Sequence, residues 1–128
     1  MRKLVVAVMA LAVCFGVVSA VEAMPPFNKE FVKLYVEPAK DSAFAKEFDK
    51  VKCNVCHEGT NKKNKNEYGE AVGKLLKKAD FSGAKIAEDP EGKAKEIVEA
   101  LKKVEKEKSK DGKTFGEKIK AGVLPAAS

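Results

Sequence analysis

The last two cysteines and the only histidine of the chain stand together in one short stretch, KCNVCHEG, at residues 52–59. Two residues separate Cys53 from Cys56, and His57 follows directly. The chain has three cysteines and one histidine in all, so this stretch holds most of its side chains that bind metals or form disulfides. The fold must therefore present these three side chains within one turn of backbone.

Several kinds of site use a cysteine pair at this spacing. A disulfide here would close a short loop and restrain the unfolded chain little, even in an oxidising compartment. A thioredoxin-type redox pair needs a βαβ setting, and no run of alternating β-branched residues is present. Structural zinc requires four protein ligands, and no further Cys or His follows the motif. C-x-x-C-H is the attachment sequence for c-type haem, so the motif predicts one haem c, with a plain disulfide as the alternative.

In this interpretation each of the three residues has a defined role. The thiols of Cys53 and Cys56 add to the vinyl groups of the haem, and His57 binds the iron from the proximal side. One helical turn is enough to present all three to the same macrocycle.

The start of the chain has the layout of a signal peptide. A short basic segment is followed by an apolar run at 4–18 and then by small residues. The tripeptide VEA predicts cleavage after Ala23, although VSA slightly earlier would also serve. We therefore expect residues 1–23 to be a signal peptide and residues 24–128 to form one periplasmic or otherwise exported domain.

Two alternatives concern this leader. The apolar run is shorter than the about 20 residues that span a bilayer, so an uncleaved leader is the alternative that would attach the chain to a membrane. Cys14 lies in LAVC, which resembles a lipoprotein cleavage sequence, but Val13 is large for its position there. We expect Cys14 to be removed with the leader.

Lysine dominates the charge of the chain, which is +6 at neutral pH. Lys52, Lys62, Lys63 and Lys65 bracket the CxxCH motif, and they predict a positive surface that attracts acidic redox proteins. Solubility alone is the alternative explanation for these lysines. Nucleic acid is not an expected partner, because the exported part has no arginine and no aromatic residues are interleaved with the basic loop.

Hydrophobic periodicity predicts an all-α domain. A first helix is expected from Pro26 to just before Pro38, and a second, capped by Asp41 and Ser42, runs into Cys53. The predicted buried stripes of these helices are Phe27, Phe31, Leu34 and Tyr35, and then Phe44, Phe48 and Val51. A polar loop at 58–66 follows.

The second half of the chain predicts further helices. A third helix is expected at 67–78. Its Gly69 and Gly73 predict close approach of another backbone or of the haem. Residues 80–88 are expected to be a turn or a short helix. The longest helix begins at Asp89-Pro90 and ends at SKDG, and a capping box at Thr114 opens the last one. The predicted buried positions are Tyr68, Val72, Leu75 and Leu76, and then Ala94, Ile97, Val98, Leu101 and Val104. Glu91 with Lys95 and Glu99 with Lys103 are the expected ion pairs of the solvated face.

A small exported all-α chain with a single CxxCH resembles the class I monohaem cytochromes c. The segments MPPFNKEF, KCNVCHEG, NEYG and FGEKIKAGVLP further resemble a group of small haem proteins of planctomycete bacteria. The resemblance implies a cytochrome c-like helical domain wrapped around one covalent haem, and one-electron transfer between larger redox proteins. It implies no catalytic residue.

The chain departs from the ordinary cytochrome pattern on the distal side of the haem. No Met follows residue 24 and no second His exists, so Met24 is the candidate sixth ligand, although it also lies at the expected cleavage site. A lysine amine, Tyr35, Tyr68 or water are the alternatives. A protein ligand favours an electron carrier, whereas an open position favours a binder or sensor of NO or CO, or a weak peroxidase. A helical interaction module without haem is the third alternative.

Overall fold

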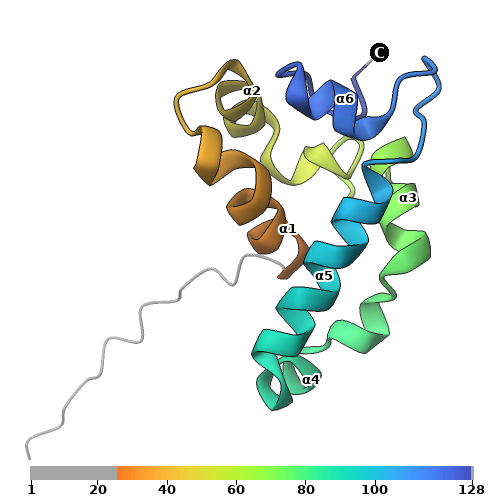
Figure 1. Ribbon diagram of the computed structural model, residues 1–128. Coiled ribbons are helices and arrows are strands. Elements are labelled where there is room, and N and C mark those ends of the chain that lie inside the picture. The colour runs from red at the N-terminus through yellow and green to blue at the C-terminus, as the bar shows by residue number, and fades with distance from the viewer. Residues whose placement is uncertain (1–25, 128) are drawn as a thin grey trace, which may run out of the picture.

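The computed structural model describes residues 26–127, and within them all regular structure is helical (Figure 1). The all-α prediction is therefore confirmed for this part of the chain. The elements are α1 (Pro26–Phe31), η1 (Val32–Val36), η2 (Glu37–Ala39), α2 (Ala43–Val51), η3 (Lys52–Val55), α3 (Glu67–Leu75), η4 (Lys78–Phe81), α4 (Gly83–Glu88), α5 (Pro90–Val104) and α6 (Phe115–Lys120).

The long helix α5 lies between α1 and α3 and packs against both (Figure 1). The pair α2 and α6 lies toward one end of the molecule, and α4 lies at the other. No helix among residues 26–127 has the length and apolar character needed to cross a bilayer.

The first helical segment is less regular than its sequence predicts. It begins at Pro26, widens to a π-helix in η1 and tightens to a 3-10 helix in η2. The helix that begins at Pro26 ends at Val36, before Pro38 as predicted, and Pro38 lies in a separate 3-10 element, η2, that the sequence did not predict. Proline is tolerated in the first turn of a helical element, where a backbone N–H has no partner within the element in any case.

The second helix agrees with the sequence in its cap and in its buried face. The Ser42 hydroxyl accepts a hydrogen bond from the Ala45 amide at 3.2 Å, and Phe44 and Phe48 are buried. The chain then continues directly into η3, which carries Cys53. The expectation that the motif follows a helix whose apolar face points inward is confirmed.

The third helix ends three residues earlier than predicted, at Leu75. Leu76 adopts an extended backbone and turns into the core, whereas Leu75 is 44% exposed. The prediction that both leucines lie on the buried side is therefore wrong for Leu75. The chain leaves helical geometry between the two leucines, so they no longer share a helix face.

The longest helix has the expected cap and a slightly different buried stripe. Asp89 Oδ1 accepts from the Gly92 amide at 2.9 Å. Ala100 is buried with Ile97, Leu101 and Val104, whereas Ala94 and Val98 are only partly buried. The two predicted i,i+4 ion pairs do not form among the described residues; the ion pair on this helix is Lys93 with Glu96, at 3.1 Å. The expected short helix before it is present as α4.

The last helix is opened by the predicted capping box. Thr114 Oγ1 accepts from the Glu117 amide at 3.1 Å, and Glu117 Oε2 accepts from the Thr114 amide at 2.7 Å. Gly122 follows with φ of 76°, a conformation that favours glycine. The prediction of a last short helix at this place is confirmed.

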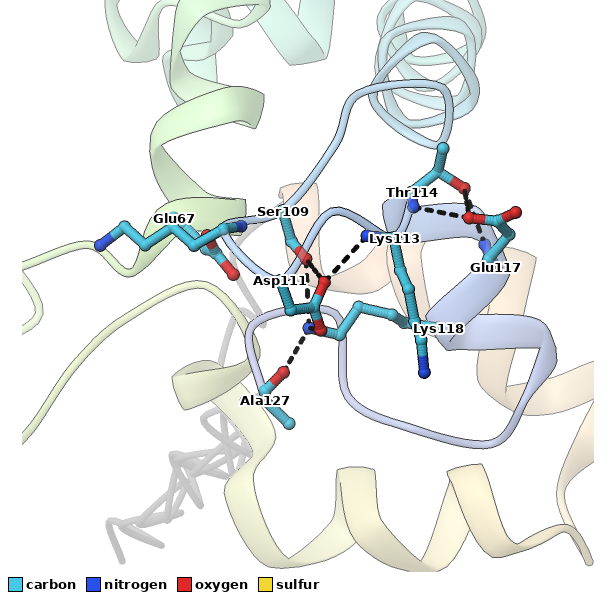
Figure 2. Close-up of polar contacts among 9 residues, drawn as sticks. Glu67, Ser109, Asp111, Lys113, Thr114, Glu117, Lys118 and Ala127 are labelled. Atoms are coloured by element: carbon cyan, nitrogen blue, oxygen red, sulfur yellow. Dashed lines mark hydrogen bonds and ion pairs between the residues drawn. The ribbon is translucent and has the colours of Figure 1, made fainter.

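A buried lysine ties this helix to the end of the described chain. Lys118 is 3% exposed, and Figure 2 shows its ammonium between Ser109, Asp111 and Ala127. The Nζ atom lies 2.9 Å from Asp111 Oδ2, and it donates to the Ala127 carbonyl and to Ser109 Oγ. Hydrogen bonds from Ser109, Lys118 and Lys113 hold the pKa of the Asp111 carboxyl well below its usual range. The buried ammonium thus has three oxygen partners, one of which is a carboxylate.

Aromatic rings form the centre of the core. Phe31 is stacked on Phe48 with a centroid distance of 5.6 Å, and it meets the edge of Tyr68 at 5.9 Å. Tyr68 in turn contacts Phe115 at 5.2 Å. These rings come from α1, α2, α3 and α6, so one cluster joins helices from both halves of the chain.

Candidate functional site

The CxxCH motif begins on the 3-10 element η3, which follows α2 directly: Cys53 lies in η3, Cys56 is its C-cap residue, and His57 lies beyond it, in a bridge with Lys65. Lys52, the residue before Cys53, has φ of 46° and ψ of −112°, which is unusual for a residue with a side chain. This conformation redirects the chain at the end of α2. The Cys56 amide then donates to the Cys53 carbonyl at 3.3 Å and closes the turn around both cysteines. The local fold thus brings the two cysteines onto one short turn, as the sequence predicts.

Asn66 holds this turn from the far end of the polar loop. Its side-chain Nδ2 donates to the carbonyls of Asn54 and Val55, at 3.2 and 3.0 Å. Its backbone amide donates to the Cys56 carbonyl at 3.0 Å. Three successive carbonyls of the motif therefore have their hydrogen bonds satisfied by one buried residue.

Helix α3 approaches the motif closely at Gly69. A Cβ atom at this position would lie 1.9 Å from the Cys56 carbonyl oxygen, so no residue with a side chain fits without displacing the backbone. The prediction of close approach by another backbone is confirmed for Gly69. At Gly73 the neighbour is the flexible end of Lys65 rather than a backbone, with Nζ 2.9 Å from the added Cβ.

The imidazole of His57 is oriented by the same loop. Nδ1 lies 3.0 Å from the Asn64 carbonyl oxygen, and the Glu58 amide donates to the same oxygen at 3.2 Å. Because a carbonyl oxygen only accepts hydrogen bonds, this contact assigns a proton to Nδ1, and in the neutral imidazole the lone pair is then on Nε2. Metal-binding histidines commonly donate their other ring N–H to a carbonyl in this way.

Both cysteines carry free thiols, and both are partly buried. Burial, together with the neighbouring Cys53 thiol, raises the pKa of Cys56 to about 12. A thiol with this pKa is almost fully protonated at neutral pH, whereas disulfide-exchange enzymes use a thiol with a lowered pKa. The environment of Cys56 is therefore unlike that of a redox-active thiol.

Comparison with known proteins yields no match, whether to a family model, to a curated protein or to a solved structure.

The donor set fits a c-type haem. Two free thiols at the right spacing precede an imidazole whose Nε2 is available for a metal. Across residues 26–127, no three side chains of Cys, His, Asp or Glu gather at a metal site. A haem iron is already held by its porphyrin, so a single imidazole is sufficient on the proximal side.

The candidates for the sixth, distal iron ligand differ in their surroundings. Met24 lies outside the described residues, as does the predicted signal peptide at 1–23. The Tyr35 hydroxyl donates to Glu105 Oε1 at 2.6 Å. Tyr68 is fully buried, and its hydroxyl has no hydrogen-bond partner among residues 26–127. Burial raises the pKa of both phenols, so neither is a ready phenolate ligand at neutral pH.

The four lysines that bracket the motif, Lys52, Lys62, Lys63 and Lys65, are all exposed. The Lys62 ammonium donates to the side chain of Asn54 and, at 3.4 Å, to the Gly59 carbonyl. These contacts bring a positive charge from the loop next to the turn that holds the cysteines. The lysines on which the predicted positive surface depends are thus exposed around the motif, and its acidic partner stays a prediction.

A groove of about 340 Å³ lies elsewhere, between the end of α3 and α5. Its apolar part contains Leu76, Phe81 and Ala100, and charged residues of α5 form much of its rim. None of the residues that line it belongs to the CxxCH turn.

Sequence analysis missed two residues of the site and its surroundings. Asn66 precedes a predicted helix start, and an asparagine there is a recognisable N-cap, but its contacts with the motif carbonyls leave no mark in a sequence. Glu105 lies in a run rich in lysine and glutamate, where nothing in the sequence distinguishes it from its neighbours. Its partner Tyr35 lies 70 positions away, and no local pattern connects the two.

Proposed function

We propose that this protein is an exported monohaem c-type cytochrome that carries one electron between larger redox proteins. One haem c is attached through Cys53 and Cys56, and His57 is the proximal iron ligand. The observation that carries the proposal is the hydrogen bond from His57 Nδ1 to the Asn64 carbonyl, because in the neutral imidazole it leaves Nε2 for a metal, directly after two free thiols in the sequence. The chain contributes no catalytic residue.

Bound haem supplies an iron that alternates between the ferrous and ferric states. The chain's own residues determine how this group is held. Cys53 and Cys56 anchor it on a turn whose carbonyls are already paired, so the anchor points are fixed relative to α3. The Asn64 carbonyl makes the imidazole of His57 more basic and holds its ring in one orientation. Wrapping of the haem by the helices is part of this proposal.

The lysines around the motif favour an acidic redox protein as partner. Exposed charges of one sign attract the opposite sign over about 10 Å at an ionic strength of 0.1 M, and this raises the rate of encounter. Lys62 and Lys63 lie in the loop that closes on the turn, so a partner attracted by them would approach near the attachment site. Nothing in this surface favours nucleic acid.

Variants of the motif test the attachment. In a host with haem-attachment machinery, acid-acetone extraction should leave the colour with the polypeptide, and the joint change Cys53→Ala and Cys56→Ala should release it. Cys14→Ala is the control, because this cysteine lies in the leader and should leave attachment unchanged. His57→Ala should shift the Soret band even where the thioethers still form. Extractable haem in the unaltered protein would disprove the attachment.

An open distal site is the second candidate function, as a binder or sensor of NO or CO or a weak peroxidase. It is favoured by one observation: residues 26–127 contain neither a methionine nor a second histidine. If Met24 ligates the iron, the reduced protein should resist CO and Met24→Ala should make it bind CO. If the site is open, the unaltered protein should bind CO readily. Iron that stays inert in both proteins would indicate a lysine or tyrosine ligand.

A haem-free helical interaction module is the remaining alternative. It predicts that Cys53 and Cys56 are replaced together without loss of function and that the purified protein is colourless. A visible spectrum distinguishes it from both haem proteins.

A further inference from the structure

Asn66 makes contacts of two separate kinds. As the N-cap of α3, its Oδ1 accepts from the Gly69 amide at 2.9 Å. As a donor, its Nδ2 binds the carbonyls of Asn54 and Val55, and its backbone amide binds that of Cys56. A serine or aspartate would cap the helix equally well but lacks the two side-chain N–H donors. Only the amide side chain performs both tasks here.

The donor contacts close the loop that orients His57. Residues 57 and 65 form an antiparallel bridge, directly beside the bond from the Asn66 amide to Cys56. Asn64, two residues before Asn66, supplies the carbonyl that accepts from His57 Nδ1. The position of this acceptor relative to the imidazole therefore depends on the pairing of Asn66 with the motif.

All of these bonds run within the polypeptide. The carbonyls at the end of a 3-10 turn otherwise need water or a ligand to satisfy them. Here residue 66, which is buried, satisfies them, and Gly69 leaves room for α3 to lie against Cys56.

We infer that Asn66 sets the geometry of the Cys53–His57 turn in the chain itself, before any cofactor is attached, and is a positioning residue for His57. The role of His57 as a ligand rests on the function proposed above, whereas the pairing of Asn66 with the turn does not. Replacing the amide should release the imidazole from the Asn64 carbonyl while α3 keeps its cap.

The test compares Asn66→Ser with Asp89→Ser in the full chain made without haem-attachment machinery. Asp89 caps α5 through the same kind of bond, to the Gly92 amide at 2.9 Å, and lies outside the motif, so it is the matched control. Nitrogen-15 NMR of the His57 ring reports which nitrogen carries the proton, and hydrogen exchange reports the Asn66 and Glu58 amides. Asn66→Asp is a second variant in case the serine variant does not fold.

We expect the unaltered chain and the Asp89 variant to hold the proton on Nδ1 and to protect both amides. In the Asn66 variants both amides should exchange at least about tenfold faster, and the proton should redistribute towards Nε2. In a haem-attaching host, the Asn66 variants should also yield a smaller covalently loaded fraction than the Asp89 variant.

Two results would overturn the inference. One is an unchanged tautomer with unchanged amide protection in the Asn66 variants. The other is an unaltered haem-free chain without protected amides at the turn, because the cofactor and not Asn66 would then set the geometry. A chain that keeps the Asn66 contacts but attaches no haem in a competent host would contradict the proposed function and leave the inference standing.

Discussion

Two tyrosine hydroxyls of the core have opposite hydrogen-bonding states. Tyr35 donates to Glu105 at 2.6 Å, whereas the buried Tyr68 hydroxyl has no hydrogen-bond partner in the described part of the chain. A made hydrogen bond to a charged acceptor stabilises the fold, and a buried hydroxyl without a partner costs free energy. Removing each hydroxyl by a change to phenylalanine should therefore affect stability differently at the two positions.

We expect Tyr35→Phe to lower the free energy of unfolding by about 1–3 kcal/mol, because it leaves the Glu105 carboxylate without its donor. Tyr68→Phe should leave the free energy of unfolding unchanged or raise it, because the ring contacts with Phe31 and Phe115 remain. Urea unfolding of both variants measures the difference. A larger loss from Tyr68→Phe would mean that its hydroxyl is paired.

The hydrogen bond between Tyr35 and Glu105 also predicts that the protein loses stability at alkaline pH. Burial and the bond to Glu105 raise the pKa of Tyr35 above its ordinary value of 10.0. The unfolded chain ionises first as the pH rises, so this contribution to stability is complete below pH 10 and is lost above it. Tyr35→Phe should flatten the decline above pH 10. An unchanged alkaline slope would contradict the raised pKa.

Lys52 is the residue whose backbone conformation is least suited to its side chain. Its φ of 46° lies where glycine is favoured, at the junction between α2 and the motif. We expect Lys52→Gly to be neutral or stabilising by up to about 1 kcal/mol, since the relief of strain offsets the added chain entropy. Lys46→Gly, at an exposed position inside α2, should cost about 1 kcal/mol. Equal losses in thermal unfolding would show that Lys52 is not strained.

At the scale of elements, the contact between α3 and the CxxCH turn depends on one glycine. Gly69→Ala should destabilise the protein by about 1–3 kcal/mol, because its Cβ meets the Cys56 carbonyl. Gly73→Ala, on the same helix, should be neutral or stabilising by up to about 1 kcal/mol, since Lys65 can move aside. Urea unfolding of the two variants gives the comparison. Equal changes in stability for the two variants would mean that α3 does not pack against the motif at Gly69.

Local patterns predicted the elements that local physics determines. The caps at Ser42, Asp89 and Thr114 satisfy helix N–H groups a few residues away, so the sequence alone identifies them. Periodicity failed at Leu75 and Leu76, because the helix ends between two residues that a continuous helix would place on one face. It also missed Lys118, because its burial depends on Asp111 and Ala127, which lie beyond the helix that carries it.

In the candidate site, too, local features were predictable from the sequence and long-range contacts were not. The spacing of Cys53, Cys56 and His57 predicts a common turn, and the structure places both cysteines on one. The closeness of Gly69 to another backbone was also predictable from a costly glycine within a helix. The roles of Asn64 and Asn66 were not, because they depend on how the loop at 58–66 folds back.

At the scale of the whole molecule, the charge around the motif should govern encounters with a redox partner. The joint change Lys62→Glu and Lys63→Glu should slow electron transfer with an acidic partner about tenfold or more at low ionic strength, and the difference should shrink as salt is added. Lys77→Glu with Lys78→Glu makes the same charge change beside η4, towards α4 at the other end of the molecule (Figure 1). Stopped-flow rates over a salt series test this. Equal slowing by both pairs would mean that net charge matters and the surface around the motif does not.

The proposed electron transfer requires covalent attachment of one haem at Cys53 and Cys56. The most direct measurement is the intact mass of the full chain purified from a host with haem-attachment machinery, followed by mass spectrometry of its peptides. We predict a mature chain heavier by the mass of one haem, with the added mass on the peptide that contains the motif, and no addition after both cysteines are changed to alanine. A mature chain at its bare polypeptide mass, or two hydrogens lighter because the cysteines have formed a disulfide, would contradict the proposal.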